Sequence, residues 1–180
     1  IYQLSQLMTE NVLKHYRCAI YVDFPSGVKA RNLAEQKALG LKPTINVLDA
    51  YKVINWDTQI VNNAEILSLV VIEESASVIS DDGFSRKTKT QYRVLRLING
   101  LYSVQLFRPR DDGEFDIDEP IFPTDFNGNA WKFIPFTFCG AVDNTPSIRK
   151  SPMIELALLN LAHYRNSADV EESAFSIGQP

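Results

Sequence analysis

Hydrophobic residues follow helical intervals near both ends of the chain and strand-like patterns in its middle. Leu4, Leu7 and Val12 recur on one face of a predicted helix, which runs into a short β-rich segment at 19–25. Residues 31–39 predict a second short helix, because a glycine follows it directly and a proline lies shortly beyond.

The middle of the chain predicts a run of about five strands joined by hairpins. Residues 66–72 are an almost unbroken run of Val, Ile and Leu, which is typical of a strand covered on both faces. Asn99-Gly100 separates two β-rich runs, and this pair favours the positive φ angles that a two-residue hairpin turn requires. Further elements are predicted at 49–56 (a helical turn), 81–83 and 125–129 (turns) and 131–138 (a strand).

The last helical pattern begins at Ser151-Pro152, where serine is a typical N-cap and proline a typical first helical residue. The helix is predicted to run toward Ala174. Its first half is apolar on nearly every side, so we expect it to be buried between neighbouring elements.

The order of these elements predicts an α+β fold with an antiparallel, hairpin-rich β-sheet and flanking α-helices, because the strands are not separated by crossover helices. We divide the chain into 1–48 (helix, short strand, helix), 49–145 (the β-rich region) and 146–180 (the last helix). The chain begins inside a helical pattern and ends where an extended segment is expected. We therefore expect it to be the central part of a longer protein.

Composition narrows the function classes. The 180 residues include 18 basic and 22 acidic side chains, which gives a net charge of -4. This balance argues against a protein whose whole surface binds nucleic acid by neutralising phosphates. Cys18 and Cys139 are too few for a disulfide scaffold, and no zinc-site spacing is present. No apolar run is long enough for a membrane span, so we expect a soluble chain without membrane contact.

The sequence predicts no catalytic set. The eight glycines are scattered among turns, so no phosphate-binding loop is formed. Cys139 or Cys18 beside a histidine, or His15 and His163 as proton carriers, would be the candidates for a hydrolase, but packed side chains are the simpler interpretation. The acidic run 111–119 lacks the register of a calcium loop and is interpreted as a solvated loop. We expect no enzyme, cofactor or metal.

Basic and aromatic residues concentrate at 86–110, which suggests a face for nucleic acid with Arg93 and Arg96 as candidate DNA contacts. A competing interpretation follows from strand alternation. Residues three apart point to opposite faces, so Arg93 and Arg96 would then belong to two ordinary solvated surfaces.

Four parts of the sequence, taken in order, resemble a protein family of tailed phages and prophages. They are 54–56 with 67–74, 91–97, 134–136, and above all 159–169 with its closing Gly178-Gln179-Pro180. The resemblance also includes 20–25 and covers nearly the whole chain. The family, once filed as a domain of unknown function, is regarded as a branch of the phage portal proteins.

This resemblance implies a structural role rather than a catalytic one. Portals form homo-oligomeric rings, commonly of about a dozen subunits, at one capsid vertex. DNA is packaged and ejected through the ring, and the implied partners are terminase, the capsid protein and a head-tail adaptor. The chain would be a wing-like region leading into the stem, located in the virion and, during assembly, in the host cytoplasm. The candidate subunit-interface residues on the last helix are Leu159, Asn160, His163, Tyr164 and Arg165.

Overall fold

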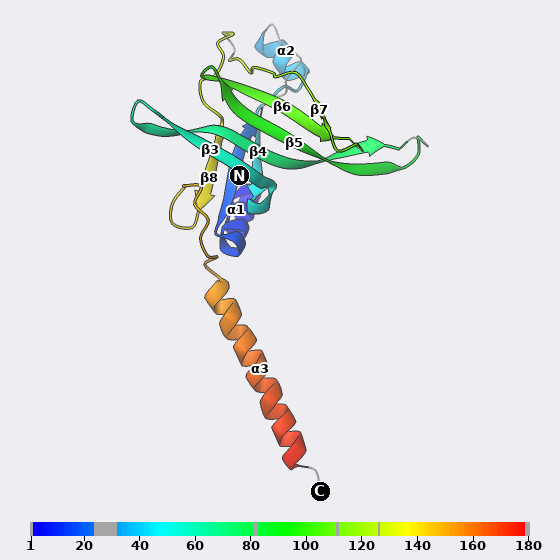
Figure 1. Ribbon diagram of the computed structural model, residues 1–180, viewed down its shortest axis with the longest axis vertical. Coiled ribbons are helices and arrows are strands. Elements are labelled where there is room, and N and C mark those ends of the chain that lie inside the picture. Colours follow the sequence, from blue (N-terminus) through cyan, green and yellow to red (C-terminus); the bar gives the residue numbers. More distant parts are fainter. Residues whose placement is uncertain (1, 24–31, 81–82, 111, 126, 179–180) are drawn as a thin grey trace. The chain divides into compact units, whose positions relative to one another are not determined.

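The structure is a computed structural model that describes residues 2–23, 32–80, 83–110, 112–125 and 127–178 (Figure 1). It confirms the predicted α+β fold, with two antiparallel sheets and helices. The elements in chain order are α1 (Tyr2–His15), β1 (Arg17–Asp23), α2 (Leu33–Ala38), β2 (Thr44–Asp49), the 3-10 turn η1 (Ala50–Lys52), β3 (Val53–Val61), β4 (Ala64–Ile79), β5 (Arg86–Ile98), β6 (Leu101–Pro109), β7 (Phe115–Ile117), β8 (Phe136–Gly140) and α3 (Ile154–Ile177).

The chain forms two compact units. One consists of residues 1–18 with 138–180, and the other of residues 19–137. The three-stranded sheet has the order β2-β1-β8 and the five-stranded sheet the order β3-β4-β5-β6-β7. Each strand of the five-stranded sheet pairs with its neighbour in sequence, so the sheet is an antiparallel meander built from successive hairpins.

The core of the 19–137 unit lies on one face of the two longest strands. Val70 and Ile72 of β4 and Leu95 of β5 are each 0% exposed, and Tyr102 of β6 is also buried. Val70 pairs directly with Leu95, and Leu97, two residues along β5 on the same face, pairs with Tyr102. Alternation along each strand therefore supplies one continuous apolar face.

Two hairpin turns of this sheet use positive φ angles. The predicted Asn99-Gly100 turn is confirmed, with φ of 52° and 76°, and it joins Ile98 to Leu101. A second turn at Asn62-Asn63, with φ of 51° and 61°, joins β3 to β4. The sequence pattern does not predict this turn. Asparagine tolerates the left-handed region, so it can replace glycine there. The turn predicted at 81–83 lies partly outside the described residues.

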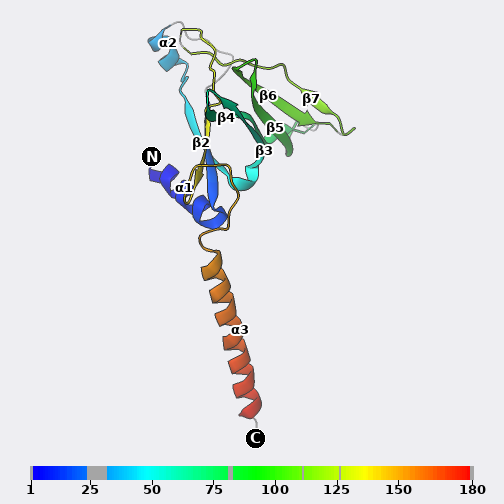
Figure 2. The ribbon, with the colours of Figure 1, turned by 60° about the vertical axis from the view of Figure 1, so that its left-hand side comes forward.

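The unit formed by 1–18 and 138–180 is held by contacts between its two chain segments. The Ser151 hydroxyl donates to the carbonyl of Leu13, and the Arg17 guanidinium donates to the carbonyl of Pro146. A Cβ at Gly140 would lie 2.3 Å from the carbonyl oxygen of Asp143, so the tight chain path there requires glycine. Figures 1 and 2 show α3 as one unbroken helix.

Several expected elements differ in the structure. Part of the acidic run is not a loop, because Phe115–Ile117 pairs with β6 as an edge strand. The helical turn expected at 49–56 is limited to η1, and the chain continues as β3. The strand expected at 131–138 begins only at Phe136, because Pro135 has no N–H to offer a ladder. The last helix begins at Ile154, three residues after the expected cap, and Ser151 accepts from the N–H of Met153 at 3.2 Å.

Candidate assembly surfaces

The helix α3 buries none of its side chains, which contradicts the expectation that it lies between neighbouring elements of the chain. It spans 24 residues, and its large apolar side chains are between 38% and 85% exposed. A helix that is hydrophobic on most sides normally gains its stability by burying that surface. The apolar surface of α3 therefore lacks a partner among the described residues.

Most apolar side chains of α3 fall into two stripes, and Leu158 lies outside both. Seam A follows steps of three, four and seven residues and consists of Ile154, Ala157, Leu161, Tyr164, Ala168 and Phe175. Seam B follows the same kind of steps and consists of Leu156, Leu159, His163, Val170 and Ile177. At 3.6 residues per turn the two seams are centred roughly 150° apart around the helix axis. Polar residues, among them Asn160 and Ser167 on one flank, separate them.

The structure does not place the five predicted interface residues on one surface. Leu159 and His163 lie on seam B, and Tyr164 lies on seam A. Asn160 occupies a polar flank, and Arg165 borders seam A one turn beyond Leu161. All five are exposed. His163 Nδ1 lies 3.3 Å from the Ser167 hydroxyl, a local contact along the helix. The spacing of the two stripes can be read from the amino-acid sequence alone.

Arg93, a candidate DNA contact, is held by carboxylates instead. Its Nε donates to Glu74 Oε1 at 2.6 Å and its Nη2 to Glu74 Oε2 at 3.2 Å, and its Nη1 lies 3.6 Å from Asp23 Oδ2. Burial lowers the pKa of Arg93, but the hydrogen bond and charge of Glu74 outweigh burial, so the net shift is upward. The guanidinium is fixed in a charge-assisted fork and is not available to a phosphate.

Two buried tyrosines continue this polar network. The hydroxyls of Tyr21 and Tyr102 lie 3.1 Å apart, and Tyr21 donates to Asp23 at 3.1 Å, so Tyr102 is the donor to Tyr21. Burial raises the pKa of Tyr21 to about 12 and also raises that of Tyr102. The network joins β1 to β4, β5 and β6 through Tyr21, Asp23, Glu74, Arg93 and Tyr102. Its groups satisfy one another, which is the arrangement of a structural network rather than an open site.

The other basic residues of 86–110 divide into paired and unpaired groups. Arg96 is three residues from Arg93 in an unbroken ladder and therefore lies on the opposite face, and its Nε is buried without a hydrogen-bond partner among the described residues. Arg108 and Arg110 are paired with Asp118 at 2.6 Å and Asp112 at 3.8 Å. Arg86, Lys87 and Lys89 are exposed and form no ion pair within the described ranges.

The thiols and histidines do not form a catalytic group. Cys18 is buried and Cys139 half-buried. Burial raises the pKa of Cys139, although a hydrogen bond to Cys18 lowers it in part. A nucleophilic cysteine requires the opposite shift. No cluster of three or more metal-ligating side chains occurs in the part of the chain that the structure describes.

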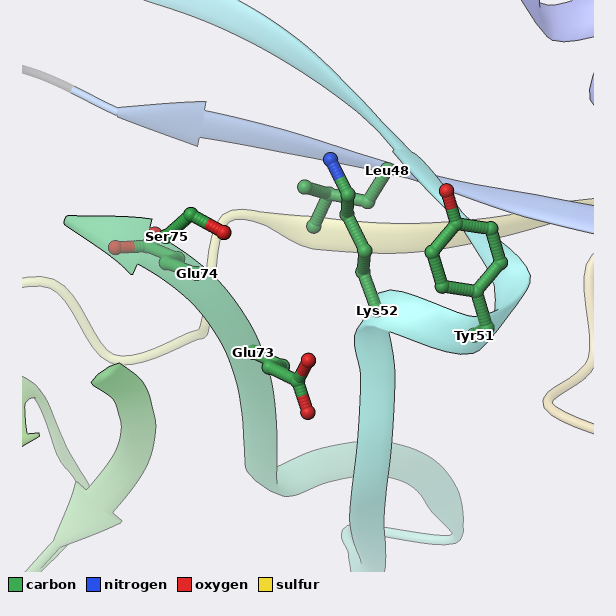
Figure 3. A pocket seen from close by; sticks show the side chains of 6 residues that line it. All are labelled: Leu48, Tyr51, Lys52, Glu73, Glu74 and Ser75. Atoms are coloured by element: carbon green, nitrogen blue, oxygen red, sulfur yellow. The ribbon is translucent and has the colours of Figure 1, made fainter. Parts of the chain in front are cut away.

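A half-open hollow of about 570 Å³ lies beside η1 and β4 (Figure 3). Its lining is Leu48, Tyr51, Lys52, Glu73, Glu74 and Ser75. Glu74 is already bound to Arg93, and the Tyr51 hydroxyl donates to Asp49 at 2.6 Å. Two of the polar groups that line the hollow, those of Glu74 and Tyr51, therefore serve local contacts.

A scan against protein-family models finds no match, and a search of the curated proteins finds none either. Among the described residues, no helix combines the length and hydrophobicity needed to cross a membrane.

Proposed function

We propose that the chain is a structural subunit of a phage portal ring, through which DNA is packaged and ejected at one capsid vertex. The observation that carries this proposal is α3, a helix that buries none of its side chains and has two apolar seams on nearly opposite sides. The family resemblance of the sequence supports it independently. The proposed partners are further copies of the chain, about a dozen in the full-length protein, with terminase, the capsid protein and a head-tail adaptor.

A closed ring requires two different surfaces on each subunit, and the two seams of α3 would supply both. In a cyclic assembly each subunit presents two different surfaces, one to the preceding copy and one to the following copy. A two-fold dimer needs only one self-complementary surface. Seam A of one subunit packed against seam B of the next would bury both stripes and repeat around the ring. The DNA would pass through the channel enclosed by the subunits, in the virion and, during assembly, in the host cytoplasm.

The role is proposed as non-enzymatic. The raised pKa of Cys139 keeps its thiol protonated near neutral pH, and Arg93 and Tyr21 are engaged in a closed network. A ring that lets DNA slide also needs few fixed phosphate contacts, because each neutralised phosphate adds to the affinity. The net charge of -4 fits such a channel component.

The alternative function is a nucleic-acid-binding module that uses the basic stretch 86–110. One observation favours it: Arg86, Lys87 and Lys89 form no ion pair with the residues that the structure describes, and the neighbouring Phe84 is 95% exposed. The pairing of Arg93, Arg108 and Arg110 with carboxylates weakens it, because those cations are no longer available for phosphates.

The ring proposal is tested by placing one charge on each seam of the full-length protein. Leu161→Glu on seam A and Leu159→Glu on seam B should each abolish rings seen by electron microscopy and shift the mass distribution to the monomer. The cause is a carboxylate desolvated in an apolar interface. Asn160→Glu lies on the polar flank and is the matched control, which should still form rings.

Mixing the two variants sharpens the test. A Leu161→Glu copy retains seam B and a Leu159→Glu copy retains seam A, so an equimolar mixture should stop at the heterodimer. Higher oligomers in the mixture, or rings in either single variant, would refute the two-seam arrangement. A wild-type protein that stays monomeric at assembly concentrations would refute the ring itself.

A further inference from the structure

The paired ends of β4 and β5 form a two-stranded extension of the five-stranded sheet. We call the segments 75–79 and 86–90, with Phe84, the basic arm (Figure 1, right). The two strands pair from Ser75↔Thr90 to Ile79↔Arg86. The ladder between β3 and β4 ends at Ile72, and the ladder between β5 and β6 ends at Tyr92. Both outer edges of the basic arm therefore lack a strand partner among the described residues.

The basic arm combines unpaired cations with exposed apolar side chains. Arg86, Lys87 and Lys89 carry the charges, and Ile79 and Phe84 are 63% and 95% exposed. An exposed two-stranded ribbon with apolar residues is marginal alone and tends to pair with another chain. Its chemistry calls for a partner that offers carboxylates, apolar side chains and a free strand edge.

The β7 border of the same sheet, near the base of the arm, has these properties. We call residues 112–119, which include β7, the acidic edge. The side chains of Glu114, Asp116 and Glu119 are exposed and form no ion pair within the described residues. Phe115 and Ile117 are 42% and 53% exposed. β7 is the last strand in the sheet order, so no further strand of the described chain pairs with its outer edge, although the Arg110 guanidinium donates to the Phe115 carbonyl at 3.4 Å.

We propose that the basic arm of one subunit docks on the acidic edge of the next copy of the chain. Lys87 and Lys89, which share one face of the arm, then face carboxylates of the acidic edge, while Arg86 lies on the other face of the arm. A free strand edge of the arm adds to the outer edge of β7. The contact joins two different surfaces, so it repeats around a ring in the same sense as the α3 seams. It rests on the proposed ring and adds a second, electrostatic contact between neighbours.

A nucleic acid fits the basic arm less well. The Phe115 ring of the acidic edge lies 6.0 Å from the Tyr92 ring, at the base of the arm, so the carboxylates border the arm within one subunit. They would repel a polyanion. Three cations also supply fewer phosphate contacts than the six to ten or so of a strongly held duplex.

The test reverses the charges on each side of the contact in the full-length protein. The arm variant is Arg86→Glu, Lys87→Glu and Lys89→Glu, and the edge variant is Glu114→Lys, Asp116→Lys and Glu119→Lys. Each variant alone should raise the concentration needed for half-assembly about tenfold, because the screened ion pairs become repulsive. The variant that carries all six changes should assemble like the wild type. So should an equimolar mixture of the two triple variants, in which opposite charges meet again.

Mass photometry and electron microscopy measure assembly, and fluorescence anisotropy with a 20-base-pair DNA measures nucleic-acid binding. Rescue by the six-fold variant and by the mixture would support the docking proposal. Assembly that is unchanged in all variants would overturn it while leaving the α3 ring intact. Salt-dependent DNA binding that is lost in the arm variant and not rescued by the edge changes would overturn it in favour of a nucleic-acid arm. Failure of every protein, including the wild type, to assemble would overturn both proposals.

Discussion

The sheet unit 19–137 and the helix α3 differ in the burial of their apolar residues. Strand alternation in the sheet unit places Val70, Ile72 and Leu95 on one face, and all three are completely buried. α3 also carries large apolar side chains, among them four leucines, yet none of its side chains is buried. The sheet unit completes its core within one chain, whereas none of the described residues covers the apolar surface of α3.

Polar side chains show the same difference. The network of Tyr21, Asp23, Glu74, Arg93 and Tyr102 is closed, because each charged or hydroxyl group has a partner within the unit. On α3 most polar residues flank the two seams, although His163 lies in seam B and Glu171 and Glu172 fall where seam A continues between Ala168 and Phe175. Stability and assembly are therefore expected to depend on different residues.

The largest effect is expected from one substitution made in both regions. Leu95→Ala removes a fully buried side chain and should lower the free energy of unfolding by about 2–5 kcal/mol, since it leaves a cavity. Leu161→Ala on seam A should leave the unfolding of the dissociated subunit within about 0.5 kcal/mol and weaken assembly instead. Urea unfolding of dilute protein and mass photometry separate the two outcomes. Equal destabilisation by both would show that α3 has a partner within the chain.

Alkaline pH should lower the stability of the sheet unit, because the buried Tyr21 hydroxyl loses its proton. Its pKa is raised to about 12 in the folded state, so the folded protein holds this proton more tightly than the unfolded chain, whose tyrosine titrates near 10. The stabilisation is present below pH 10 and is lost as the pH rises through 12, by at most about 3 kcal/mol. Urea unfolding between pH 9 and 12 measures the loss. Tyr21→Phe removes the titrating hydroxyl, and a pH dependence as steep as that of the wild type would contradict this assignment.

Removing the guanidinium at the centre of the network should have the next largest effect. Arg93→Ala leaves Glu74 and Asp23 without their cation and should cost about 2 kcal/mol. Arg93→Lys should recover only part of this, because an ammonium cannot form the two-point contact. Arg110→Ala is the exposed control and should change the free energy of unfolding by less than about 0.5 kcal/mol. DNA affinity that falls with Arg93 while stability does not would restore it as a DNA contact.

The hairpins show which features can be predicted from sequence. Asn99-Gly100 is predicted because glycine marks positive φ, and alternation on either side fixes the register. Asn62-Asn63 forms the same kind of turn without that marker and was missed. The short strand β7 was also missed, because acidic residues dominate its surroundings, and its pairing with β6 depends on a tertiary contact between Phe107 and Phe115. Local signals predict hairpins well, but edge strands depend on what lies beside them.

The interface and the polar network show where sequence reasoning fails. The apolar character of α3 was evident, but periodicity does not say whether the partner is the same chain or another, and the expectation of burial was wrong. Arg93 resembled a DNA contact because basic residues cluster around it in sequence. The acidic groups that hold it, Asp23 and Glu74, come from distant segments, so only the fold brings the three together.

The smallest expected effect concerns the missed turn, and it separates local backbone strain from packing. Asn63 has a φ of 61°, so Asn63→Gly should raise the free energy of unfolding by about 0.5 kcal/mol, because glycine enters this region without steric cost. Asn63→Ala should lower it by about 1 kcal/mol, because the Cβ is strained there. Neither change should alter ring assembly, since the turn lies outside both α3 seams. Urea unfolding measures the two signs, and a loss of stability in both variants would show that the Asn63 side chain, not its backbone angle, stabilises the turn.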